Sequence, residues 1–121
     1  MADLIYDLAL ALFITHELDA IKRREWRMFP GTHLLDDKAG YTVFTLAHVP
    51  LFAVIFWLSD SQSAHAPAFR LGMAVFLIIH VGLHIAFARH PANEFNNPFS
   101  QTIIWAAGGM GVLYLIAHAN L

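Results

Sequence analysis

The sequence predicts an all-α integral membrane protein, a four-helix bundle whose N- and C-termini both lie on the non-cytoplasmic side. The composition supports this class, because 58% of the residues are hydrophobic and only 13% are charged. In soluble domains about a quarter of the residues are charged. Four apolar segments are each long enough to cross a bilayer, which takes roughly 20 residues. With 121 residues, the chain is expected to form one domain in contact with lipid.

The four spanning helices are expected at about residues 4–28, 40–58, 68–89 and 99–118. Connections rich in proline, glycine, serine and asparagine separate them, as is usual for loops. The second helix contains Pro50, and proline kinks helices. Asn97 and Pro98 are typical of the cap and first turn of the last helix. No cleaved signal peptide is expected, because the N-terminus has no basic segment and no cleavage site.

The orientation follows from the basic residues, which gather at one end of the predicted bundle. Only Arg70 lies near the second connection, whereas the other six flank the first and third: Lys22, Arg23, Arg24, Arg27, Lys38 and Arg89. Because short loops rich in Lys and Arg stay in the cytoplasm, both termini are expected on the other side. The net charge of −2 and the lack of a basic stripe exclude nucleic acid as a partner.

Ionisable side chains inside the spans are costly, so they need partners or a function. At 100° per residue, His16 and Asp19 share one face of the first helix. His48 lies on the second helix, and His80 and His84 lie at i and i+4 on the third. A rise of about 1.5 Å per residue places the four histidines in one layer near the predicted cytoplasmic edge. They are therefore expected to form one inward-facing cluster.

The cluster predicts a transition metal site for zinc, iron or copper. The predicted ligands are four imidazoles and a carboxylate that either binds the metal or orients a histidine: His16, His48, His80, His84 and Asp19. Since the chain has no cysteine, thiolate ligands are excluded. Two alternatives stay open. One is a hydrogen-bond network that only holds the helices together, and the other is a haem bound by His48 with His80 or His84.

Glu17 is the candidate catalytic residue. The pair His16-Glu17 matches half of the zinc-protease motif H-E-x-x-H, but residue 20 is alanine, so the second ligand is missing. Glu17 is either a general base beside a metal held by other helices or an interfacial neighbour of Arg24. The main hypothesis is a metal-dependent membrane enzyme with an apolar substrate. The alternatives are a non-enzymatic accessory or scaffold subunit and a small transporter.

Two further segments are interpreted as structural. The patch from Ala106 to Gly111 predicts close packing of the last helix, within the bundle or in a homo-oligomer formed through Gly108, Gly109 and Gly111. Glu25-Trp26-Arg27 predicts an anchor at the membrane surface, with the tryptophan at the depth of the lipid headgroups.

Several motifs along nearly the whole chain resemble an uncharacterised bacterial family of small four-helix membrane proteins. They are His16-Glu17-Leu18-Asp19-Ala20, Glu25-Trp26-Arg27, Ala47-His48-Val49-Pro50-Leu51-Phe52, His80-Val81-Gly82-Leu83-His84 and the segment from His90-Pro91 to Asn97. A looser similarity to membrane proteins with an HXXEE motif is partial, since Asp19 and Ala20 stand where that motif has two glutamates. The resemblance implies a multi-pass protein of the bacterial inner membrane and gives no reaction.

Overall fold

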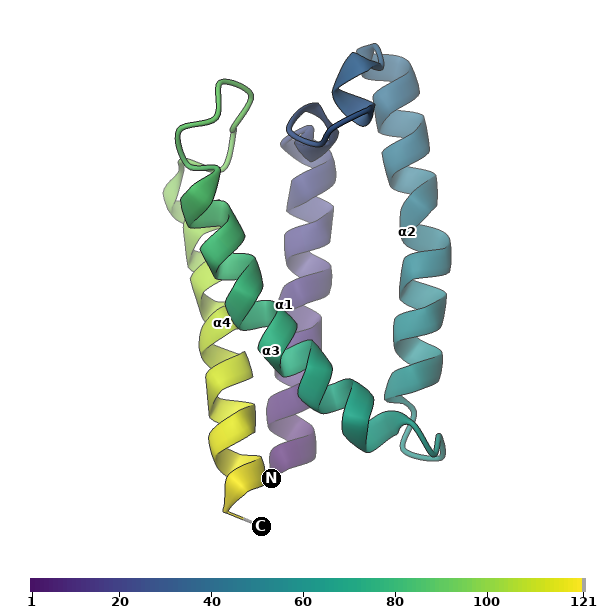
Figure 1. The fold of residues 1–121 in the computed structure, drawn as a ribbon, viewed down its shortest axis with the longest axis vertical. Helices are drawn as coiled ribbons and strands as arrows, with labels where there is room; N and C mark the ends of the chain where they lie inside the picture. Colours follow the sequence, from purple (N-terminus) through teal and green to yellow (C-terminus); the bar gives the residue numbers. More distant parts are fainter. Residues whose placement is uncertain (121) are drawn as a thin grey trace.

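Four long helices make up most of the protein, which is described by a computed structural model covering residues 1–120. The helices are α1 (Ala2–Lys22), α2 (Asp37–Ser59), α3 (Ala66–Ala86) and α4 (Pro98–Ala119), and two short 3-10 segments, η1 (Glu25–Arg27) and η2 (Thr32–Leu34), connect α1 to α2. Within these residues there is no strand. The predicted all-α, four-helix class is therefore confirmed (Figure 1).

Three of the helices, α2, α3 and α4, are long and apolar enough to cross a membrane. Large apolar side chains on them point outward, and residues such as Leu46, Val49, Ile79 and Leu113 are exposed. A surface of this kind needs lipid or protein to cover it, which indicates contact with a bilayer. The helix α1 is of similar length, but it also carries acidic residues near both of its ends.

The helix α4 packs closely against α1 and α3. A Cβ atom on Gly108 would lie 2.5 Å from Cγ2 of Val81, and one on Gly111 would lie 2.7 Å from the carbonyl oxygen of Ala74. Gly109 faces open space, with nothing within 4 Å of such an atom. Gly108 and Gly111 therefore allow α4 to pack closely against α3 of the same chain.

The helix α2 stands apart from the other three along much of its length (Figure 1). It begins at the cap residue Asp36, whose side chain accepts a hydrogen bond from the amide of Ala39 at 2.8 Å, and it continues through Pro50. Near its end, the Ser59 hydroxyl lies 2.6 Å from the Tyr6 hydroxyl of α1. An open groove lies between α2 and the helices α1 and α3.

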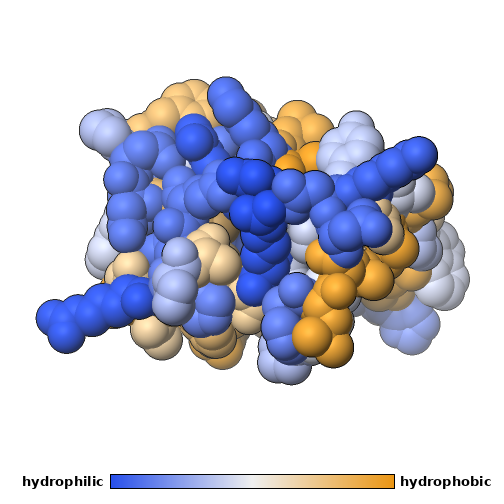
Figure 2. Space-filling model, turned by 90° about the horizontal axis from the view of Figure 1, so that it is seen from above, coloured by the Kyte–Doolittle hydropathy of each residue, from blue (hydrophilic) through white to orange (hydrophobic). Residues whose placement is uncertain are grey.

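The start of α1 and the end of α4 lie at one end of the bundle, and the η1–η2 connection lies at the other (Figure 1). At the terminal end, Arg70 binds Asp3 at 2.6 Å. At the opposite end, Arg24 binds Glu94 at 2.6 Å, and Arg27 is ion-paired with Asp37. Figure 2 views this end and shows hydrophilic side chains over most of it, as expected where a bundle meets water.

The first helix ends earlier than predicted, at Lys22 rather than at about residue 28. Arg24 adopts a left-handed conformation with a φ of 54°, which turns the chain back into η1. Trp26 is thereby buried against Gly40, where a Cβ atom would collide with the indole ring. Glu25 and Trp26 thus lie inside the protein, and the expected surface anchor is not formed by these two side chains.

Candidate metal centre

Three histidine side chains from two helices meet at one point in the protein. His16 comes from α1, and His80 and His84 come from successive turns of α3. The Nε2 atom of His84 lies 2.9 Å from Nε2 of His80 and 3.3 Å from Nε2 of His16. The i and i+4 spacing on α3 puts two of the rings on one face, and the contact with α1 adds the third.

Glu25 of η1 completes the group, with its Oε1 atom 3.8 Å from Nε2 of His84. The side chains of His84 and Glu25 are only 7% and 9% exposed, and His16 is 2% exposed. One ligand atom from each of the four residues lies within 4.8 Å of the others. These four residues could together hold a metal ion, and we use the name metal centre for this candidate site, formed by His16, Glu25, His80 and His84.

The spacing of these nitrogens fits tetrahedral coordination. Zinc binds histidine nitrogen at about 2.0–2.1 Å, so neighbouring ligands in a tetrahedron lie about 3.3–3.4 Å apart. The 3.3 Å between His84 and His16 matches this value, whereas the 2.9 Å between His80 and His84 is shorter and the 3.8 Å between Glu25 and His84 is longer. A set of three imidazoles and one carboxylate also suits iron or copper.

Aromatic rings enclose the metal centre. Phe95 lies 5.5 Å from His16 and 4.7 Å from His84, measured between ring centroids, and Phe76 lies 5.3 Å from His80. Burial, together with the neighbouring Glu17 carboxylate, raises the pKa of Glu25 to about 8. A carboxylate in such apolar surroundings needs a positive partner to remain charged.

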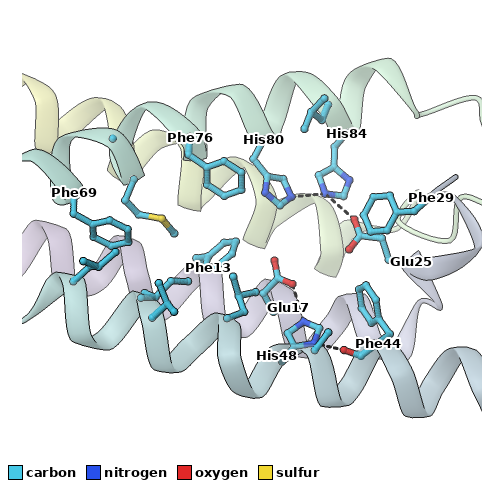
Figure 3. Close-up of a pocket in the computed structure, with 18 of the residues that line it drawn as sticks. Phe13, Glu17, Glu25, Phe29, Phe44, His48, Phe69, Phe76, His80 and His84 are labelled. Carbon is cyan, nitrogen blue, oxygen red and sulfur yellow. Dashed lines mark hydrogen bonds and ion pairs between the residues drawn. The ribbon is translucent and has the colours of Figure 1, made fainter. Parts of the chain in front are cut away.

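A second buried pair, Glu17 of α1 and His48 of α2, faces the metal centre across the groove (Figure 3). The Nε2 atom of His48 lies 2.9 Å from Oε2 of Glu17. Its Nδ1 atom lies 2.7 Å from the carbonyl oxygen of Phe44, and since a carbonyl only accepts, Nδ1 carries a proton. The remaining proton lies between Glu17 and His48, so this pair is able to give or take one.

The predicted ligand Asp19 lies elsewhere in the bundle. It accepts hydrogen bonds from Arg23, at 3.2 Å, and from the Ser100 hydroxyl of α4, and it is not a member of the metal centre. Its position ties α1 to α4. The i,i+4 spacing of Asp19 and Arg23 on α1 favours this ion pair.

The groove beside the metal centre has a volume of about 1110 Å³. Most of its lining is apolar and comes from α1, α2 and α3, including Phe13, Leu51, Phe69, Met73 and Phe76. Its polar side chains gather towards the η1 end, as Figure 3 shows: Glu17, Glu25, His48, His80 and His84. The remaining polar residue, His65, lies at the start of α3.

The structure thus brings together three of the five predicted ligands and adds Glu25. His48 contacts Glu17 instead, and the candidate base Glu17 does face the groove. Glu25 was missed because a helix extended to residue 28 would carry it away from the bundle. The residues around Arg24 do not predict its left-handed conformation. The one available signal is Gly40, whose lack of a side chain is compatible with a large neighbour such as Trp26.

A family model described as a family of unknown function (DUF6713) matches residues 2–121. The chain belongs to this family, which confirms the resemblance to an uncharacterised family. No curated protein and no solved structure shows significant similarity to the chain.

Proposed function

We propose that this member of the DUF6713 family is a membrane protein that binds a transition metal ion at the metal centre. The ion is held by Nε2 atoms of His16, His80 and His84 and by the carboxylate of Glu25. The observation that carries this proposal is the convergence of three imidazole nitrogens on one buried point.

Hydrogen bonding alone does not account well for this convergence. A ring nitrogen has either one proton or one lone pair, yet Nε2 of His84 has two imidazole neighbours. It therefore cannot form two full hydrogen bonds at once. A metal ion instead accepts one lone pair from each ring, which favours a metal centre over a purely structural network.

We further propose that the protein is an enzyme acting on an apolar substrate. A bound ion would supply Lewis-acid activation of a substrate oxygen or of water. Glu17 is the proposed catalytic residue, because it faces the groove and shares a proton with His48. The role of His48 is to set the protonation of Glu17, and the surrounding phenylalanines exclude water from the site.

Metal analysis of the purified protein tests the proposal. The wild-type protein and two variants are loaded in turn with zinc, ferrous iron and copper, desalted and analysed by mass spectrometry of the elements. We expect one ion per chain in the wild type and a loss of it in His84→Ala.

His65→Ala is the matched control, since His65 lines the groove but lies outside the metal centre. It should retain the ion. The proposal is wrong if, for all three metals, the wild type holds no more metal than His84→Ala. The cluster would then be a hydrogen-bond network only.

A further inference from the structure

We propose that the groove binds a single-chain amphiphile with an uncharged head group that donates a hydrogen bond, such as a long-chain alcohol. The head lies at Glu17 and His48, and the chain runs between α2 and α3. This names the substrate class of the proposed enzyme and rests on that function for turnover, but binding itself does not require the metal.

The groove is long enough to take an extended hydrocarbon chain. On α2, the lining runs from His48 through Leu51 to Leu58, which at about 1.5 Å per residue is roughly 15 Å. On α3, the lining from Phe69 to His80 covers a similar distance. Along this length the walls are aliphatic and aromatic, so they match a hydrocarbon chain.

The polar end of the groove selects the head group by charge. Among the described residues that line the groove, none is Lys or Arg, so a phosphate or carboxylate head finds no basic partner. A hydroxyl group, in contrast, donates a hydrogen bond to a carboxylate oxygen or an imidazole nitrogen.

Gly72 keeps the groove open on the α3 side. It lines the groove, and a Cβ atom placed there would have no atom within 4 Å. A large side chain at this position is therefore expected to occupy part of the groove. Gly82, on the same helix, is equally open but does not line the groove, which makes it a matched control.

Photolabelling tests the proposal. The protein is placed in phosphatidylcholine nanodiscs with a diazirine-bearing hexadecanol, and labelled peptides are mapped by mass spectrometry. The diazirine-bearing fatty acid and phosphatidylcholine of the same chain length serve as competing probes. We expect the alcohol to label the groove-facing parts of α2 and α3 more strongly than either competitor.

Gly72→Phe should reduce this labelling to the level of a sample kept in the dark, and Gly82→Phe should leave it unchanged. If Gly72→Phe does not fold, Gly72→Val gives a smaller blockage, with Gly82→Val as its control. Equal labelling by all three probes would show that bulk lipid fills the groove. A change of oligomeric state in Gly72→Phe would show that a second copy covers it, and either result overturns the proposal.

Failure of this proposal is distinguishable from failure of the metal centre. His84→Ala should lose the metal and still be labelled by the alcohol, whereas Gly72→Phe should keep the metal and lose the label. Persistent labelling in Gly72→Phe, with the metal retained, would contradict the amphiphile site alone.

Discussion

Glu17 and Glu25 line the same groove, but their partners differ. Glu17 is hydrogen-bonded to His48, whereas Glu25 lies beside His84 in the metal centre. A carboxylate that already shares a proton with an imidazole is suited to acid–base chemistry. A carboxylate near three imidazole nitrogens is suited to metal coordination. We therefore propose different roles for the two glutamates.

Exchanging each glutamate for glutamine tests this assignment. Loss of a residue that only hydrogen-bonds to a metal ligand lowers metal affinity by ~10–100-fold. Glu25→Gln should lower it by more than this, because it removes an anionic ligand. Glu17→Gln should leave the affinity nearly unchanged. Titration of the apo-protein with zinc in competition with a chelator measures both. An equal loss in the two variants would contradict the assignment.

At the scale of single residues, the sequence predicted the positions of the histidines better than their partners. The i,i+4 spacing of His80 and His84 and the face of His16 follow from helical periodicity. Periodicity does not say which of several polar neighbours a side chain selects. Hence His48 was assigned to the metal but contacts Glu17, and Asp19 contacts Arg23 and Ser100.

Among the helices, the contact between α3 and α4 depends on glycine. Gly108→Leu should destabilise the protein by about 1–3 kcal/mol, because its side chain would press on Val81. Gly109→Leu should not, since Gly109 faces open space. Thermal unfolding in detergent compares the two variants. If Gly109→Leu were the more damaging, the orientation of α4 would be wrong.

The η1 segment depends on Gly40 in the same way. A methyl group at this position would collide with Trp26 and shift η1, which carries Glu25 into the metal centre. Gly40→Ala should therefore lower both the stability, by about 1–3 kcal/mol, and the metal affinity.

Gly82→Ala is the control for Gly40→Ala, because its Cβ atom would meet no neighbour. Replacing glycine by alanine within a helix stabilises it by about 0.5–1 kcal/mol, so Gly82→Ala should unfold at a slightly higher temperature. Unaltered metal affinity in Gly40→Ala would mean that Trp26 does not position Glu25.

At the scale of the whole molecule, the existence and order of the four helices could be predicted from hydropathy and loop composition. The separation of α2 from its neighbours could not. A pattern of faces shows which side of a helix is inward but not how far the helix lies from the next one. The groove depends on that distance and therefore could not be predicted from the sequence.

The basic residues at the η1–η2 end predict that this end of the protein faces the cytoplasm. The absence of native cysteine allows a direct test with single cysteines at Leu34 and Ser61, two exposed positions near opposite ends. In intact cells, a membrane-impermeant thiol reagent should label Ser61→Cys. It should label Leu34→Cys only after permeabilisation, and the reverse pattern would invert the topology.

The metal centre is tested most directly by the X-ray absorption spectrum of the metal-loaded protein. For zinc, we predict a shell of nitrogen and oxygen at about 2.0–2.1 Å, with the scattering pattern of three imidazole rings. His16→Ala should reduce that pattern to two rings. A spectrum of a hydrated ion, or one that is identical in the wild type and in His16→Ala, would contradict the metal centre.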